Sequence, residues 1–381
     1  MADQFSLIID CKKEETVRAA LLQNGEVLSF YLLPAADDLR LGDLYLAEVS
    51  NERLKSVGWF LKLGDDLVGF LPRNKALDPR KMSPGTRHLV QIEKEAHGHK
   101  KAQLTEYIQI SGRGLIYLPR SNYVAVSREI DQSRREIYKK KLAAWCSAPE
   151  GVIVRTQAQT LDTKSLQEEL RNQRAHWRRL LHEAGQKDVS RFIERPFSFI
   201  ASILNENHCP ASCTIRSNGP LDLDDLPRDV SVSIASDIDL FEQEGIESLY
   251  QSALHSVVPL PIGGSLVINY TEALTAIDVN SGSLRFETDW EEQALRINAA
   301  AARMAARQLR LREIGGMVVI DFLRLNLAQD RDKVLRILQE CLMKDTATVK
   351  LFGYSAMGLV ELTRKKRRYG LQDFIKGQLD V

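Results

Sequence analysis

The last third of the chain alternates short apolar segments with long amphipathic ones, and this alternation constrains the fold more than any other feature. Such an order predicts a sheet with right-handed crossovers and helices covering a face. The first predicted helix, over 289–313, ends at Gly315-Gly316, a fitting C-terminal stop. The predicted strands are 263–270, 273–280, 317–323, 348–354 and 359–366, with a second helix at 330–343.

Two of these apolar strands each carry an aspartate near their end, Asp278 and Asp321. Burying a carboxylate beside an apolar run is costly unless a cation or hydrogen bonds compensate. If the two strands are neighbours, both carboxylates emerge at the same edge of the sheet, where ligand sites lie. Two hard oxygen ligands suit Mg²⁺, and Asn280 on the same strand face would orient Asp278. The spacing equally fits two aspartates that cap the turns after their strands.

The earlier part of the chain has a different rhythm. Residues 41–106 alternate short apolar segments with turns, which predicts a small antiparallel barrel. Strands at 5–11 and 16–33, the latter folded at an Asn24-Gly25 turn, are expected to pair with a later segment. Residues 107–190 mix strands with a long polar helix over 162–185, which Asp162 or Thr163 can cap.

Composition bounds the kind of protein. At 381 residues the chain is expected to form two or more packed units, and 44% apolar and 27% charged residues are typical of a globular protein. A net charge of +1 means that any nucleic-acid affinity must come from local clusters of Lys and Arg. The sequence shows no secretory signal and no membrane segment, so we expect a cytoplasmic protein.

The sequence lacks the motifs of several common kinds of catalytic and metal-binding site. The five cysteines are scattered and do not suggest disulfides; the segment HCPASC, 208–213, is either a weak zinc site or a pair of ordinary thiols. There is no HExxH pattern, no phosphate-binding GxxxxGK loop and no evident catalytic triad. Phosphate chemistry without these motifs favours metal-assisted hydrolysis.

Three segments resemble the catalytic region of the ribonuclease E/G family: TEALTAIDVNSG, RMAARQLRLREIGGMVVIDF and FGYSAMGLVELTRKK. Weaker similarity extends over nearly the whole chain in the family's domain order. The resemblance implies a multidomain α+β and α/β fold, in which a split ribonuclease-H-like subdomain contains an inserted barrel. The implied domains are a first ribonuclease-H-like part (1–38), an S1-type OB-fold RNA-binding domain (39–106), a 5′-sensor region (107–190), the second ribonuclease-H-like part (191–253), and a deoxyribonuclease-I-like catalytic subdomain with a basic tail (254–381).

Carried over residue by residue, the resemblance places Asp278 and Asp321 on the family's two magnesium ligands and Asn280 on the catalytic asparagine beside the first. It implies an endoribonuclease that cleaves single-stranded, AU-rich RNA in RNA decay or processing. A metal-activated water would leave 5′-phosphate and 3′-hydroxyl ends. Mg²⁺ is the implied cofactor, with Mn²⁺ able to substitute for it.

In the barrel, Phe60 and Phe70 fall on aromatic positions that the family uses to bind RNA, and Lys100 falls on their basic partner. Exposed rings stack on bases without demanding a sequence. From the residues alone, Phe60 and Phe70 also fit the barrel core. The polar helix over 162–185 is, in the same way, either a solvated surface or an RNA contact.

For the 5′-end pocket, the resemblance places Arg155 and Thr156 on the phosphate-binding pair and Gly112 on a backbone contact. An Arg fork and a hydroxyl suit a terminal monophosphate. A plain surface ion pair is the alternative for Arg155. Thr348 stands where the family commonly has a further basic residue, which weakens the expected preference for a monophosphate.

Other departures concern the catalytic region. Arg324 replaces an acid one turn of strand beyond Asp321, and the chain ends at Val381 without the family's CPxC zinc-link motif. We therefore expect no structural zinc, while a homodimer through the catalytic subdomain stays open. The basic segment 364–370 is either an RNA contact or a solvated tail. The alternative to an active nuclease is a weak or inactive RNA-binding or regulatory member of the same family, and a deoxyribonuclease is a third reading.

Overall fold

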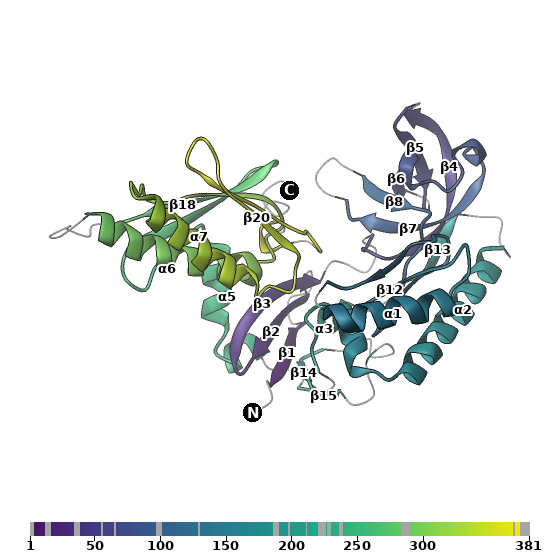
Figure 1. Cartoon of the computed structure of the whole chain (residues 1–381), viewed down its shortest axis with the longest axis horizontal. Coiled ribbons are helices and arrows are strands. Elements are labelled where there is room, and N and C mark those ends of the chain that lie inside the picture. Colours follow the sequence, from purple (N-terminus) through teal and green to yellow (C-terminus); the bar gives the residue numbers. More distant parts are fainter. Residues whose placement is uncertain are drawn as a thin grey trace. The chain divides into compact units, whose positions relative to one another are not determined.

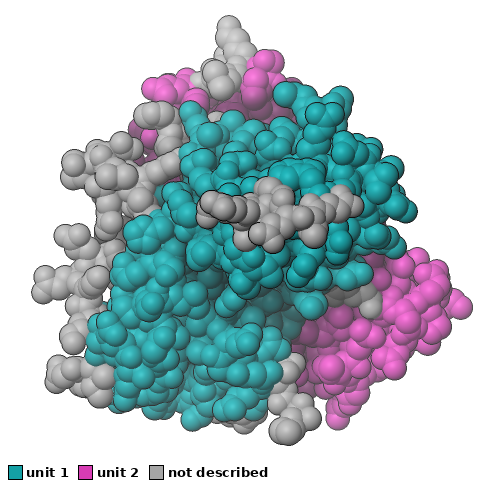
Figure 2. Space-filling model, turned by 90° about the vertical axis from the view of Figure 1, so that its left-hand side faces the viewer, with its two compact units in different colours: residues 1–37, 199–381 teal, residues 38–198 magenta. Residues whose placement is uncertain are grey.

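The chain forms two compact units, residues 1–37 with 199–381 and residues 38–198 (Figure 2). The structure is a computed structural model that describes residues 4–11, 17–33, 39–54, 56–64, 66–96, 101–128, 130–185, 190–196, 199–210, 212–219, 226, 230–235, 239–282, 290–368 and 370–373. Among these residues, no helix combines the length and apolar character that crossing a membrane requires.

The first sheet of unit 1 contains strands from both of the chain segments that form that unit (Figure 1). Asn24 and Gly25 both have positive φ, 52° and 84°, as a two-residue hairpin turn requires. The first strand pairs in parallel with residues 214–217, which confirms that the N-terminal strands need a later partner. The strand order is β15 (Ser231–Ile234), β14 (Thr214–Ser217), β1 (Phe5–Asp10), β2 (Val17–Gln23) and β3 (Glu26–Leu33).

Helices pack on both faces of this sheet, which explains why β2 is buried almost throughout. Ile8, Ala20 and Phe30 pack with residues of α4 (Leu240–Gln243) and α5 (Glu247–Leu254). The alternate residues, such as Leu7 and Leu21, pack with α3 (Phe199–Glu206).

The second sheet of unit 1 is the one predicted from the last third of the chain. Its strand order is β16 (Val257–Pro259), β17 (Ser265–Tyr270), β18 (Leu274–Asn280), β19 (Gly316–Asp321), β21 (Val360–Arg364) and β20 (Val349–Tyr354). Helix α6 (Trp290–Leu311) connects the parallel pair β18 and β19, and it packs with α7 (Ala328–Leu342) on one face (Figure 1). The predicted crossover and the helix-covered face are confirmed.

The stop of α6 differs from the prediction. Glu313, with φ of 52°, takes the left-handed conformation, and the Ile314 N–H donates to the Leu309 carbonyl at 2.9 Å. This six-residue closure ends the helix at Leu311, four residues before Gly315. Gly315 is instead required by packing, because a Cβ there would lie 2.6 Å from the Lys366 Cα.

Unit 2 contains a closed five-stranded barrel that is consistent with an OB-fold. The barrel order is β4 (Leu44–Leu54), β5 (Gly58–Lys62), β6 (Val68–Pro72), β8 (Ala102–Thr105) and β7 (Arg87–Lys94), and β7 pairs with β4 to close it. Short 3₁₀ turns η1 (Arg73–Lys75) and η2 (Pro79–Lys81) follow β6. Strand β13 (Arg191–Glu194) pairs antiparallel with β4 and so extends the barrel sheet. Residues 191–194 were expected to begin the second ribonuclease-H-like part.

The rest of unit 2 is a small sheet covered by helices. Its order is β11 (Val124–Val126), β12 (Gly151–Val154), β10 (Leu115–Leu118) and β9 (Ile110–Ser111). The predicted long helix is α2 (Thr163–Gly185), and the Asp162 carboxylate caps it by accepting the Ser165 N–H at 2.7 Å. Helix α1 (Gln132–Trp145) and the turn η3 (Thr156–Thr160) complete this part. Leu166, Leu170 and Trp177 of α2 pack into its core.

Candidate functional site

Asp278 and Asp321 are direct register partners on the parallel strands β18 and β19. Neighbouring strands lie about 5 Å apart, so the two Cα atoms are separated by about that distance. Ile277 and Val279 of β18 and Ile320 of β19 are buried in the core with α6 and α7, so the alternate residues point to the opposite face. Both carboxylates are therefore exposed on the face away from α6 and α7.

Two like charges directly opposite each other in a sheet destabilise it unless a cation or a hydrogen-bond donor lies between them. The Asn280 amide Nδ2 donates to Asp278 Oδ2 at 2.9 Å, which holds that carboxylate in one orientation. The structure thus brings together all three residues predicted at this place.

The loop after Asp321 is held by α6. Buried Asn298 donates to the Leu323 carbonyl at 2.8 Å and accepts the Leu323 N–H at 2.9 Å. The Glu291 carboxylate accepts the N–H groups of Asn326 and Leu327 at 2.8 and 2.9 Å. The local sequence gives no signal for either contact, because Asn298 and Glu291 lie 25 and 36 residues from their partners Leu323 and Leu327.

Arg324 lies in this loop, since β19 ends at Asp321 rather than continuing as a strand. Its side chain is exposed. The predicted placement on a further turn of strand is therefore wrong. Phe322 and Leu325, before and after Arg324, pack into the core that the sheet forms with α6 and α7.

The donor set at Asp278 and Asp321 fits a hard divalent cation. Within the described parts of the chain, no group of three or more His, Cys, Asp or Glu side chains is placed to hold a metal. Mg²⁺ is commonly bound by one or two carboxylates, with water and phosphate oxygens completing its coordination. Two adjacent carboxylates, one of them oriented by an amide, meet that requirement.

Phe60 and Phe70 are cross-strand partners in the barrel, with ring centroids 5.3 Å apart. Their neighbours Trp59, Leu61 and Leu71 form the barrel core, so the two rings lie on its outer face, half-buried. The alternative that they belong to the barrel core is wrong. Lys100 lies outside the described residues.

Gly112 and Arg155 are brought together in the small sheet of unit 2. The Arg155 guanidinium Nη1 donates to the Gly112 carbonyl at 2.7 Å, and the hydroxyls of Thr156 and Ser127 are 3.0 Å apart. Arg155 precedes η3, which starts at Thr156. The three residues predicted for 5′-phosphate binding therefore share one region.

Two side chains of α2 hold the loop that contains Gly112. The Glu169 carboxylate accepts the N–H groups of Gly114 at 3.0 Å and Leu115 at 2.9 Å, and Gln173 donates to the carbonyls of Ile110 and Leu115 at 3.1 Å each. A Cβ at Gly112 would lie 2.1 Å from Glu169 Oε1. The sequence does not single out Glu169 or Gln173 for this role, because both stand on a helix with many polar residues.

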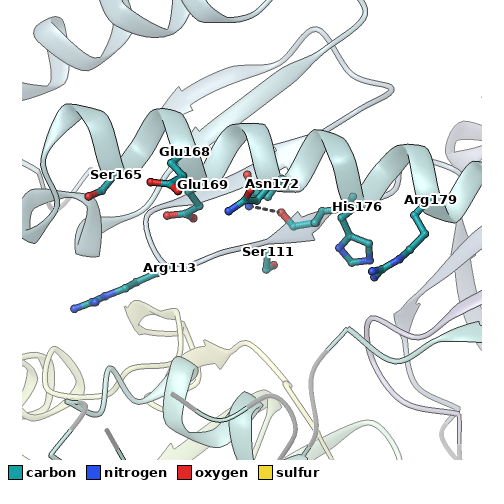
Figure 3. Close-up of a pocket in the computed structure, with 10 residues that line it drawn as sticks. Ser111, Arg113, Ser165, Glu168, Glu169, Asn172, His176 and Arg179 are labelled. Carbon is teal, nitrogen blue, oxygen red and sulfur yellow. Dashed lines mark hydrogen bonds between the residues drawn. The ribbon is translucent and has the colours of Figure 1, made fainter. Parts of the chain in front are cut away.

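A shallow pocket of about 550 Å³ lies along the same helix (Figure 3). Ser165, Glu168, Asn172, His176 and Arg179 reach into it from α2, and Ser111 and Arg113 face them. His176 and Arg179 both pair with Glu194, at 2.7 and 3.5 Å. Arg174 of the same helix pairs with Glu150 at 2.5 Å, so at least two arginines of α2 have a carboxylate partner within unit 2.

The segment HCPASC holds a pair of thiols. Cys209 and Cys213 are hydrogen-bonded to each other, which raises the pKa of Cys209 and lowers the pKa of Cys213. None of the five cysteines forms a disulfide bond.

The basic segment 364–370 is largely built into the fold. Arg364 is 2% exposed and pairs with Asp345 at 2.7 Å and Glu313 at 3.2 Å. Burial alone would lower the pKa of Arg364, but these two carboxylates raise it. Arg368 is buried and pairs with Glu206. Neither an RNA contact nor a solvated tail describes these two arginines, although Lys365 is exposed.

A barrel with outward-facing aromatic rings and a sheet with paired carboxylates are features of proteins that act on nucleic acids. The sequence pattern of the Ribonuclease E/G family matches residues 109–367, and the chain belongs to this family.

Named relatives agree with this assignment. The chain is 30% identical to Ribonuclease E of Synechocystis sp. over 367 residues, 90% of this chain and 54% of that protein. It is 28% identical to Ribonuclease G of Escherichia coli (strain K12) over 395 residues, 96% of this chain and 81% of that protein. It is 29% identical to Ribonuclease E of the same strain over 390 residues, 94% of this chain and 37% of that protein. The chain therefore spans about half of the first relative and most of the second.

Proposed function

We propose that this chain is a Mg²⁺-dependent endoribonuclease that cleaves single-stranded, AU-rich RNA in RNA decay or processing, with Mn²⁺ as a substitute metal. The observation that carries the proposal is the register pairing of Asp278 with Asp321 on the exposed face of the sheet. Membership of the Ribonuclease E/G family supports the RNA substrate.

In this proposal Asp278 and Asp321 hold the metal ion, and Asn280 keeps Asp278 oriented by donating to its Oδ2. When bound, Mg²⁺ supplies positive charge for the scissile phosphate and lowers the pKa of an attacking water. Asn298 acts through the backbone of Leu323 to fix the chain that follows Asp321. The products would carry 5′-phosphate and 3′-hydroxyl ends.

The other residues predicted to contact RNA would hold the RNA strand in place. Phe60 and Phe70 stack on bases from the outer face of the barrel, together with Lys100. Gly112, Arg155 and Thr156 bind a 5′-terminal phosphate; the Arg155–Gly112 hydrogen bond supports their grouping. A homodimer through the catalytic subdomain is part of the same proposal.

The test compares the wild-type protein with Asp278→Asn and Asp321→Asn on a 5′-monophosphorylated AU-rich RNA. We expect internal cleavage with Mg²⁺, none with EDTA, and a loss of at least a hundredfold in each variant. Glu272→Gln is the matched control, because Glu272 is an exposed acid in the turn before β18. A DNA strand of the same sequence separates ribonuclease from deoxyribonuclease activity.

The second candidate is an RNA-binding member of the family with weak or no cleavage. Arg324, exposed three residues after Asp321, favours it, because a fixed positive charge close to a cation site weakens metal binding. RNA binding without Mg²⁺-dependent cleavage would support this candidate. Recovery of cleavage in Arg324→Asp would attribute the weakness to that charge.

A further inference from the structure

The face of the catalytic sheet that bears the two aspartates continues from β19 across two further strands, β21 and β20. Asp321 lies at the end of β19, and Val319, two residues earlier, is the register partner of Ala276 on one side and Glu361 on the other. Glu361 in turn pairs with Gly353 of β20. Phe352, next to Gly353, therefore lies two strand spacings from Asp321, roughly 10 Å sideways, and about two residues along. Lys350 pairs with Thr363, the partner of Met317, and so lies about four residues along.

Strand β20 presents a basic and an aromatic side chain to this face. Val349 and Leu351 pack against the core with α6 and α7, so Lys350 and Phe352 point the other way. Phe352 is 55% exposed, and the Lys350 Nζ lies 4.7 Å from the centre of its ring. A β-bulge between Leu351 and Gly353 interrupts the pairing at Phe352.

Apolar side chains lie between the aspartates and the ring. Val319 is half-buried, and Met317 on the same strand face is 53% exposed. Glu361 is exposed on this face as well, and its charge disfavours a phosphate there. The middle of the face thus suits a neutral, flat group, with anions favoured only near the metal site and near Lys350.

A single-stranded nucleic acid has this alternation of flat neutral bases and phosphates. An exposed ring stacks on any base, and a neighbouring cation contacts the backbone. The position of Phe352 is within reach of nucleotides next to a phosphate held at Asp278 and Asp321.

We propose that Phe352 and Lys350 form a nucleotide-binding subsite on the open face of the catalytic sheet. Phe352 stacks on one base of the RNA strand close to the scissile phosphate, and Lys350 contacts a phosphate of the same segment. This inference rests on the proposed function, since it takes the strand to be RNA positioned by the metal site.

Binding is tested without cleavage by measuring anisotropy in Mg²⁺ with a fluorescein-labelled AU-rich single-stranded RNA that carries a non-hydrolysable linkage at the scissile position. Loss of one base-aromatic stack predicts an affinity for Phe352→Ala that is roughly 5- to 140-fold lower than that of wild type, and Phe352→Trp should keep the wild-type affinity. In Lys350→Ala the slope of the logarithm of RNA affinity against the logarithm of salt concentration should be shallower by about one phosphate contact. Met343→Ala is the matched control, because Met343 is 68% exposed but lies at the end of α7.

A second measurement locates the stacked base. A set of RNAs, each with one abasic nucleotide at a different distance from the cleavage site, is compared on wild type and Phe352→Ala. In wild type the abasic nucleotide should weaken binding most at one position near the site. In Phe352→Ala that penalty should disappear at the same position and remain unchanged elsewhere.

The outcomes separate this subsite from the proposed function. Unchanged RNA affinity in Phe352→Ala, or an abasic penalty that persists in it, overturns the subsite even where Asp278→Asn abolishes Mg²⁺-dependent cleavage. A change in sedimentation mass in Phe352→Ala would show that the face binds a second copy of the chain, which also overturns it. Cleavage that survives in Asp278→Asn would instead overturn the proposed function.

Discussion

Asp278 and Asp321 face each other in register across two parallel strands, and the Asn280 amide donates to Asp278. Without a cation, such a like-charge pair lowers stability, and neutralising one member removes the repulsion. The pair therefore predicts a stability signature in addition to a catalytic one.

Asp278→Asn should raise the free energy of unfolding in EDTA by roughly 0.2–1 kcal/mol. Millimolar Mg²⁺ should raise the midpoint of thermal unfolding more in the wild type than in the variant, because only the native state of the wild type has both ligands. Thermal unfolding with and without Mg²⁺ measures both effects. Equal stabilisation of the two proteins by Mg²⁺ would argue against a metal at this pair.

Asn298→Ala should lower stability by roughly 1–3 kcal/mol, because it leaves both backbone groups of Leu323 without their side-chain partner. The Mg²⁺ concentration needed for half-maximal cleavage should also rise, because Asp321 is two residues away. Denaturant unfolding and a Mg²⁺ titration of cleavage measure the two effects. A stability loss with an unchanged Mg²⁺ requirement would limit Asn298 to a structural role.

Phe60→Ala and Phe70→Ala should each weaken RNA binding by roughly 1–3 kcal/mol while leaving the barrel folded, because both rings lie outside its core. Val57→Ala is the control, since Val57 is 54% exposed in the same barrel. Anisotropy with labelled RNA and circular dichroism make the comparison. Unfolding of either variant would contradict the surface position of the rings.

Gly112→Ala should destabilise unit 2 by roughly 1–3 kcal/mol, because its Cβ would overlap Glu169 Oε1. Glu169→Ala should also be destabilising, since the N–H groups of Gly114 and Leu115 lose their acceptor. In the double variant the steric part is relieved, so the combined loss should be smaller than the sum. Denaturant unfolding of all four proteins tests this, and simple additivity would refute the proposed overlap.

Arg364→Met should lower stability by roughly 3–5 kcal/mol, because it leaves the buried carboxylates of Glu313 and Asp345 without their shared partner. Lys365→Ala, next to it and exposed, should change stability by less than about 0.5 kcal/mol. Chemical denaturation of both variants checks the contrast. A stable Arg364→Met protein with weakened RNA binding would return this arginine to the role of an RNA contact.

Local patterns predicted much of the fold. The apolar period of two in the barrel strands, the Asn24-Gly25 turn, the Asp162 cap and the apolar strands of the last third all have causes within a few residues. For the same reason the sequence singled out Asp278 and Asp321, since a carboxylate on an apolar strand is conspicuous without any knowledge of its neighbours.

The sequence by itself determined which segments are strands and helices, and which polar residues need a partner. Only the tertiary structure decided the register that sets Asp278 opposite Asp321, the outward position of Phe60, the hold of Glu169 on a distant loop and the burial of Arg364. These depend on pairing between residues far apart in the chain. A strand's period of two leaves open which face is covered, and a charge in the sequence does not show where its counter-charge will lie.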